Sequence, residues 1–448
     1  MNGTPLFNRR RIALLLLPLM LEQVLSALMG IADTMMVTTV GESAVSAVSL
    51  VDSINTLVLQ LLAALAAGGV IVCAQFLGRG DAVKANDAAR QVMLVSLLLA
   101  LGATVVCLVF RRPMLRLIFG TVEASVMDQS LEYFLITALS YPFIAAQQTA
   151  SAVFRSGGRS APPMVVTAIA NGINVVGNAV TIYVFHMGVV GAALATLASR
   201  VFAAVVLVLL LRNPELVISV RDYMRIRPDR KVIGMVLRVG VPTGVENSMF
   251  QLGKLVVQST VSTLGTAAMA AQAMTHMLNL VICMPGLAIG TGLLTVAGQC
   301  MGAEQPDQAK RFTGSFCWYS EISVVVMSLI IVPLTPFITR ISDLSSESAR
   351  LTLQLLILIS VVKVLFWVPA FTLPNCLRAA GDVRFTSTVA SVSMWIFRVG
   401  GALLLCRVFH VGLVGVWIAW FADWVFRMIL YVWRYRSGKW QEKKVIRT

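Results

Sequence analysis

The sequence predicts an all-α polytopic membrane protein with twelve transmembrane helices, arranged as two parallel six-helix repeats. Of its 448 residues, 58% are hydrophobic and 13% are charged, with a mean hydropathy of +0.83, whereas soluble domains carry about 25% charged residues. Apolar stretches of about 20 residues, long enough to cross a bilayer as helices, recur along the whole chain. The second half of the chain also repeats the first.

The apolar stretches follow one another closely. The first begins behind the charged segment "FNRRR" and has no small-residue cleavage site, so we interpret it as a span and not as a signal peptide. The predicted spans are 12–38, 47–75, 91–110, 131–153, 163–185, 189–211, 233–262, 270–299, 315–338, 351–374, 386–408 and 411–434. They define an N-lobe (1–211), an inter-lobe loop (212–232), a C-lobe (233–434) and a basic tail (435–448).

The repeat holds at one constant offset along the chain. "LPLMLEQVLSALMGIADTMMVTTVGESAVSA" aligns with "VPTGVENSMFQLGKLVVQSTVSTLGTAAMAA", so that Pro18 meets Pro242 and Glu22 meets Glu246. Further pairs at this offset are Gly41 with Gly265, Ala44 with Ala268, Gly68 with Gly292, Gln75 with Gln299 and Gly78 with Gly302. Because six is an even number of spans, both halves enter the membrane from the same side, as parallel repeats do.

The net charge of +15 predicts the orientation of the chain. Lys and Arg concentrate at both termini and in the loop 212–231, which we therefore expect in the cytoplasm. The cluster Arg111, Arg112 and Arg116 opposes this orientation but is outnumbered. No basic region is interleaved with stacking aromatics, so we expect no nucleic-acid partner. The seven cysteines lack CxxC or metal spacing, which argues against disulfides and zinc.

Three predicted spans carry polar side chains along one helical face. Such stripes face protein or water and not lipid. The first stripe is Glu22, Ser26, Met29 and Asp33, the second is Asn171, Asn174 and Asn178, and the third is Asn247, Gln251, Lys254 and Gln258. Together they predict a substrate cavity lined by Glu22, Ser26, Met29, Glu246, Asn247, Gln251, Lys254 and Gln258.

Structural roles remain open for several of these residues. Amide side chains also bond the helices of a bundle together. Glu22 and Glu246 share a repeat position close to a proline, so both could serve the architecture of the two halves. Arg398 and Asp423, in the last two spans, are predicted to form a buried structural pair. The three histidines share no ligand spacing, so we expect no metal site.

Asp33 differs from the glutamates. Its repeat position is occupied by Val257, so the two-fold architecture does not require an acid there. A lone carboxylate in a low-dielectric cavity holds a proton more readily than one in water, and it can also bind a monovalent cation. Asp33 is therefore the predicted ion-coupling residue.

Three segments resemble the multidrug and toxic-compound extrusion (MATE) transporters of prokaryotes: "IADTMMVTTVGESAVSAVSL", "AAGGVIVCAQFLGRGD" and "FRSGGRSAPP". The resemblance implies a V-shaped, two-lobed transporter that couples inward proton or sodium flow to export of organic cations and other amphiphiles. It matches Asp33 to the first-span acid of a "D-T-x-x-V" pattern. Asn174 and Asn178 match a fifth-span Asn and Asp, with an amide replacing the acid. The tenth span has Lys363 but no acid, so the cation site of another branch cannot be transferred.

The sequence thus predicts an antiporter of a bacterial inner membrane, with both termini cytoplasmic. The cation or proton site is predicted at Asp33, Asn171, Asn174 and Asn178. One carboxylate among neutral amides favours H+ over Na+, and we expect no other cofactor. The expected partners are amphiphilic small molecules and the bilayer, around a monomer. The alternative is a flippase for lipid-linked saccharides, which would favour a cavity dense in Arg and Lys. HExxH and GxSxG motifs are lacking, so we expect no catalytic residues.

Overall fold

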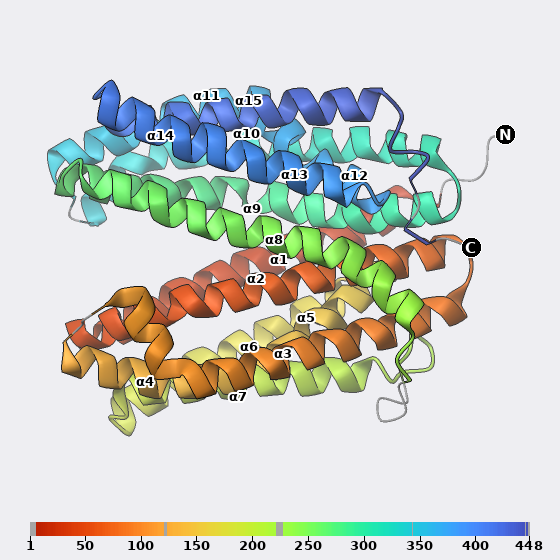
Figure 1. The fold of residues 1–448 in the computed structure, drawn as a ribbon, viewed down its shortest axis with the longest axis horizontal. Helices are drawn as coiled ribbons and strands as arrows, with labels where there is room; N and C mark the ends of the chain where they lie inside the picture. Colours follow the sequence, from red (N-terminus) through yellow and green to blue (C-terminus); the bar gives the residue numbers. More distant parts are fainter. Residues whose placement is uncertain (1–5, 121–122, 221–226, 343, 444, 447–448) are drawn as a thin grey trace. The chain divides into compact units, whose positions relative to one another are not determined.

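The computed structural model describes residues 6–120, 123–220, 227–342, 344–443 and 445–446. All regular secondary structure in these residues is helical (Figure 1), which confirms the all-α fold class. Ten helices in the described part of the chain are long and apolar enough to cross a membrane. Of the other two predicted spans, the fourth is divided at Ser140 into two helices, and the seventh is a helix that carries Glu246 and Lys254.

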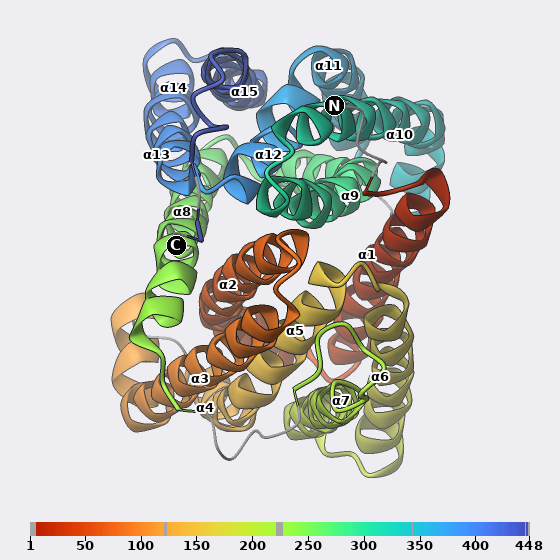
Figure 2. The ribbon, with the colours of Figure 1, turned by 90° about the vertical axis from the view of Figure 1, so that its right-hand side faces the viewer.

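The chain divides into two compact units. The N-terminal unit is Phe7–Gly244, and the C-terminal unit is Met1–Leu6 with Val245–Thr448. In the N-terminal unit α2 packs against α3, α4 and α5, while α6 packs against α1 and α7 (Figure 2). Its helices are α1 (Arg9–Thr38), α2 (Glu42–Gly78), α3 (Ala82–Phe119), α4 (Ala124–Leu139), α5 (Tyr141–Ser156), α6 (Ala161–Ala179) with the π-helical turn η1 (Val180–Val184), and α7 (Gly188–Leu210).

Helix α8 (Arg230–Ser262) contains the boundary between the units and continues into the C-terminal one. There α9 packs against α10 and α11, and α15 packs against α11 and α13. The remaining helices are α9 (Thr266–Gly302), α10 (Pro306–Ile341), α11 (Ser346–Phe371), α12 (Pro374–Ala379), α13 (Val383–Ser393), η3 (Met394–Gly400), α14 (Gly401–Leu403), η4 (Leu404–Val408) and α15 (Leu413–Arg436).

Each unit is built around its own hydrophobic core. In the N-terminal unit Val51, Phe134 and Tyr141 are completely buried in one cluster. In the C-terminal unit Ile359 and Trp417 are completely buried in another. Each half of the chain therefore buries its own apolar faces, as expected of a repeat whose halves fold in the same way.

The repeat extends to unusual backbone conformations. The π-helical turns Val180–Val184 and Leu404–Val408 occupy equivalent repeat positions. Each is followed by a histidine in the left-handed region, His186 with φ 51° and His410 with φ 52°. Non-glycine residues seldom adopt this conformation, so its appearance at both positions shows that the two halves share one backbone design.

Close helix packing is repeated in the same way. A Cβ added to Gly177 would lie 2.9 Å from the Cβ of Ala195, and one added to Gly401 would lie 3.1 Å from that of Ala419. Each glycine therefore lets the last helix of its half, α7 or α15, pack closely against the helix that carries the glycine. Small residues serve this purpose in membrane helices generally.

The turn between α2 and α3 ends in a helix cap. Gly80 has φ +81°, and the Asp81 carboxylate accepts a hydrogen bond from the backbone N–H of Lys84 at 3.0 Å. The Lys84 ammonium lies 3.1 Å from the other carboxylate oxygen. The hydrogen bonds from Lys84 hold the pKa of Asp81 below its ordinary value. The charged form of Asp81 thus stabilises the start of α3.

Candidate functional site

Asp33 lies on α1 at the end of a hydrogen-bonded chain of amides. Asn178 Nδ2 donates to Asp33 Oδ1 at 2.6 Å and to Asn174 Oδ1 at 3.2 Å. Asn174 Nδ2 donates in turn to Thr196 Oγ1 on α7, also at 3.2 Å. Asn174 and Asn178 are almost completely inaccessible, and buried polar groups require such partners. The structure thus brings together three of the four residues predicted for the ion site.

The fourth residue, Asn171, lies one turn earlier on α6 and does not line the same cavity. Its Nδ2 atom is buried and has no hydrogen-bond partner among the described residues. Asn178 Oδ1 is also buried without a partner. An unused acceptor therefore lies on the side chain that binds Asp33.

A second carboxylate, Asp52 of α2, lines the same cavity as Asp33. Its Oδ1 atom accepts from Asn55 Nδ2 at 3.1 Å and lies 3.5 Å from the Tyr133 hydroxyl. The Tyr141 hydroxyl donates to Asn55 Oδ1 at 2.7 Å and so fixes that amide. The sequence analysis did not select Asp52, although an acid within an apolar span is the same signal that identified Asp33.

These residues surround a cavity of about 190 Å³, which we call the N-terminal cavity. The charge of Arg200 on α7 acts on both Asp33 and Asp52, and its Nη1 atom donates to Ser140 Oγ at 2.7 Å. With both acids ionised, Asp33, Asp52 and Arg200 together carry one more negative than positive charge. The lining residues are Gly30, Asp33, Thr34, Val37, Val45, Val48, Ser49, Asp52, Tyr133, Asn178, Ala192 and Thr196.

The other members of the first stripe do not line this cavity. Glu22 is buried, and Arg155 Nη2 donates to its Oε1 atom at 2.7 Å. Ser26 is exposed and Met29 is half-buried. Glu22 therefore has a charged partner on α5 that sequence analysis did not identify.

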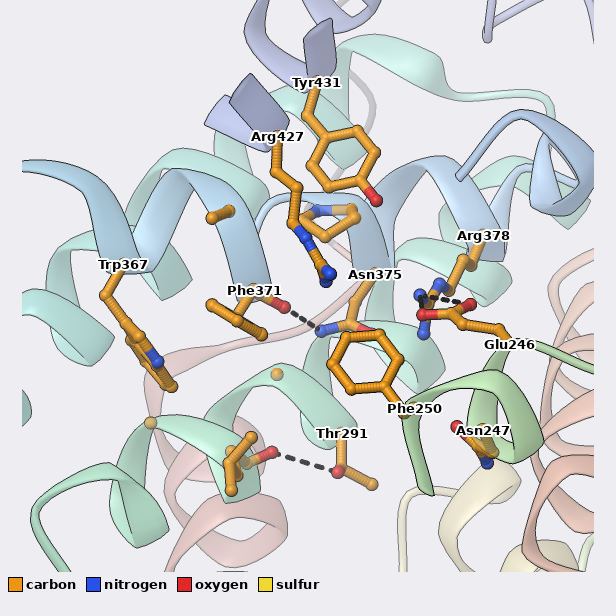
Figure 3. Close-up of a pocket in the computed structure, with 15 residues that line it drawn as sticks. Glu246, Asn247, Phe250, Thr291, Trp367, Phe371, Asn375, Arg378, Arg427 and Tyr431 are labelled. Atoms are coloured by element: carbon orange, nitrogen blue, oxygen red, sulfur yellow. Dashed lines mark hydrogen bonds and ion pairs between the residues drawn. The ribbon is translucent and has the colours of Figure 1, made fainter. Parts of the chain in front are cut away.

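Glu246 has the equivalent partner in the C-terminal unit. Arg378 Nη2 donates to its two carboxylate oxygens at 2.7 and 2.9 Å (Figure 3). Ser387 Oγ also donates to Glu246 at 2.9 Å. Arg155 and Arg378 belong to the related segments "RSGG" and "RAAG". One buried ion pair per half is thus part of the repeated architecture.

Glu246 and Asn247 line a cavity of about 260 Å³, which we call the C-terminal cavity. Figure 3 shows the Arg427 guanidinium pointing into it, beside Asn375 and the ring of Phe371. The rest of the third stripe is not part of its lining: Gln251 is half-buried, and Lys254 and Gln258 are exposed.

Behind this cavity one carboxylate serves two arginines. Arg398 Nη2 lies 2.6 Å from Asp423 Oδ2, and Arg427 Nε lies 2.7 Å from Asp423 Oδ1. Ser393 Oγ also donates to Asp423 Oδ1. All three charged residues are more than nine-tenths buried. The pair suggested by the sequence is therefore part of a buried triad with Arg427.

The profile of the MatE family matches the chain twice, at residues 18–180 and 242–404, which are separated by the repeat offset. "Uncharacterized transporter YisQ" of Bacillus subtilis is 27% identical over 95% of this chain and 94% of its own length. "Probable multidrug resistance protein NorM" of Thermotoga maritima is 26% identical over 98% and 94%. A crystal structure of MATE in the straight conformation has the same fold, with a TM-score of 0.89, 20% identity and 98% coverage of both chains.

Proposed function

The chain belongs to the MatE family of transporters, and on this premise we propose that it is a proton-coupled antiporter that exports amphiphilic small molecules by alternating access. The observation that carries the proposal is the Asp33 carboxylate, held at 2.6 Å by Asn178 in a cavity inside the N-terminal unit. A carboxylate placed among membrane helices marks an ion or proton pathway by default.

Asn178 is suited to both protonation states of Asp33. The ionised carboxylate accepts the Nδ2–H bond of Asn178. A protonated carboxyl group gains an O–H donor, which needs an acceptor. Asn178 Oδ1 is such an acceptor, and among the described residues it is buried without a donor. Rotation of the amide would offer that oxygen to the proton. An aspartate at position 178 would lack the donor that the ionised state uses.

The charges of Asp52 and Arg200 act in opposite directions on proton binding by Asp33: the Asp52 carboxylate favours it and the Arg200 guanidinium opposes it. With both acids ionised, Arg200 balances only one of them. One proton on Asp33 leaves Asp52 and Arg200 as a balanced pair, so the closed cavity carries no excess charge. Hydration on opening favours release of the proton. The membrane potential supplies roughly 2.3 kcal/mol per 100 mV for each charge moved.

Sodium is the competing coupling ion, and Asp52 strengthens that alternative. Two carboxylates and the amide oxygens of Asn174 and Asn178 are ligands of the type that hard cations prefer. The proton remains our proposal because Arg200 already neutralises one acid.

We further propose that the protein acts as a monomer in a bacterial inner membrane, with both termini and the loop 212–231 in the cytoplasm. The distribution of Lys and Arg supports this orientation. We prefer small-molecule export to lipid-linked saccharide flipping because only two arginines of the described chain line the C-terminal cavity, and Arg378 is bound to Glu246. Of these two, Arg427 alone is left with part of its charge unbalanced, because it shares Asp423 with Arg398. A pyrophosphate would require several unpaired cations.

Dye transport into inverted vesicles tests the proposal, under either an imposed pH gradient or an imposed sodium gradient. We expect transport in sodium-free buffer that a protonophore abolishes. Asp33→Asn should eliminate this coupled transport while insertion and folding persist, since the amide keeps the volume and removes only the titrating group. Asp87→Asn, at an exposed helical position, is the matched control. Sodium dependence without a pH response would refute proton coupling, and normal export by Asp33→Asn would refute the site.

A further inference from the structure

The two halves of this chain differ in charge at equivalent positions. The offset that pairs Pro18 with Pro242 also pairs Asp52 with His276 and Asn174 with Arg398. These equivalences are structural as well as sequential. Asn174 donates to Thr196 in the N-terminal unit, and at the corresponding places Arg398 stacks on Trp420, with its guanidinium carbon 4.3 Å from the ring centre.

At the same offset, Lys254 is the counterpart of Gly30, which lies one helical turn before Asp33. The charges of Lys254 and Arg398 act on each other, and both act on the half-buried His276. No salt bridge links Lys254 to a carboxylate within the described residues. Where the N-terminal unit gathers acids and amides, the C-terminal unit therefore gathers basic groups.

The charge balance around the C-terminal cavity is also positive. Its charged lining residues are Glu246, Arg378 and Arg427, and Glu246 is fully engaged by Arg378 and Ser387. Arg427 shares the carboxylate of Asp423 with Arg398, so two buried guanidinium groups have one counter-charge. A buried charge without a full counter-charge is costly, and an anion in the cavity would complete the balance.

Aromatic rings accompany this excess charge. The guanidinium carbons of Arg427 and Arg398 lie 4.7 and 5.3 Å from the centre of the Phe250 ring. Phe371 and Trp367 stack on each other in the cavity wall, with ring centroids 5.4 Å apart. Figure 3 shows the rings of Phe250 and Phe371 on either side of the Arg427 guanidinium, with Trp367 beyond Phe371. The rings offer flat apolar surfaces beside a guanidinium that can bind a carboxylate or phosphate.

We propose that the C-terminal cavity binds the anionic group of an amphiphilic organic anion, with Arg427 as the principal contact and Lys254 adding to the positive field. This inference rests on the proposed export function for its physiological meaning and narrows the substrate class to amphiphiles with a carboxylate or phosphate. One excess positive charge suits one such group. The N-terminal cavity, with its excess negative charge, remains the place of the coupling ion.

The test compares two probes that differ in charge, pyrenebutyrate and pyrenebutylammonium, bound to the full chain in phosphatidylcholine nanodiscs without any gradient. Energy transfer from tryptophan to pyrene reports binding. We expect the anion to bind about tenfold more tightly than the ammonium compound, as one charged hydrogen bond allows. A second series in nanodiscs containing phosphatidylglycerol distinguishes the source of the anion. Loss of pyrenebutyrate binding there identifies a lipid headgroup as the occupant, and unchanged binding identifies a soluble amphiphile.

Arg427→Gln should weaken pyrenebutyrate binding about tenfold, and it leaves Arg398 with Asp423 as a balanced pair. Lys254→Gln, at an exposed position, should weaken it less. Arg436→Gln, exposed on the same helix as Arg427, is the matched control and should change nothing. Equal or tighter binding of the ammonium probe would overturn the proposal, as would unchanged anion binding by folded Arg427→Gln and Lys254→Gln. Asp33→Asn should retain anion binding, so a failure of proton coupling is separable from a failure here.

Discussion

Replacement of Arg378 by glutamine should destabilise the protein more than it impairs the transport cycle. The substitution leaves Glu246 buried with Ser387 as its remaining partner. Breaking a buried ion pair costs about 3–5 kcal/mol. The Arg378 side chain is 21% exposed and that of Glu246 is 8% exposed. Because water still reaches the pair, we expect a cost at the lower end of this range, about 3 kcal/mol.

For a unit of this size, that loss corresponds to a fall in melting temperature of roughly 6 to 12 °C. The double variant with Glu246→Gln should recover part of it, because no uncompensated charge then remains buried. Arg155→Gln should have a smaller effect, since Arg155 donates to one oxygen of Glu22, at 2.7 Å, whereas Arg378 donates to both oxygens of Glu246.

The measurement is thermal unfolding in detergent, followed by size-exclusion chromatography, together with vesicle transport by the surviving folded fraction. Arg384→Gln, at an exposed position on α13, is the matched control and should unfold like the parent protein. An unchanged melting temperature for Arg378→Gln combined with lost export would refute the architectural role. Equal destabilisation by the single and double variants would refute the uncompensated-charge explanation.

Four further outcomes are expected. Asp52→Asn should reduce export driven by a pH gradient several-fold without unfolding the protein; export equal to that of Asp87→Asn would remove Asp52 from the coupling site. A cysteine at Asn213 should react with an impermeant maleimide only after cells are opened, whereas one at Glu123 should react from outside; the reverse pattern would overturn the orientation. Gly177→Val should cost about 1–3 kcal/mol through overpacking against Ala195, measured as a lower melting temperature, while Gly30→Ala, with nothing within 4 Å, should be neutral. The pKa of Asp81 is depressed in the folded protein, so its cap stabilises the fold at pH values above the pKa of the unfolded carboxyl group. This stabilisation is lost as the pH falls through the folded pKa. Asp81→Ala should therefore lower the melting temperature at neutral pH and have little effect in acid.

The polar stripes predicted part of the candidate site. Asp33, Asn174 and Asn178 lie on two predicted helices, and the structure joins them by hydrogen bonds. The helical period placed Asn174 and Asn178 on one face, because residues four apart are neighbours on a helix. It could not show that Asp52 of α2 lines the same cavity, because that depends on how α1 and α2 are rotated about their axes.

The sequence by itself determined the all-α fold, the spans and the two-fold repeat, because hydropathy, helix length and a constant offset are properties of local segments. It also identified the acids that required an explanation. Only the tertiary structure decided their partners. Glu22 is bound by Arg155 and Glu246 by Arg378, residues far away along the chain. A buried charge is stabilised by whichever group the packing of the helices brings within hydrogen-bonding distance, and no single helix contains that information.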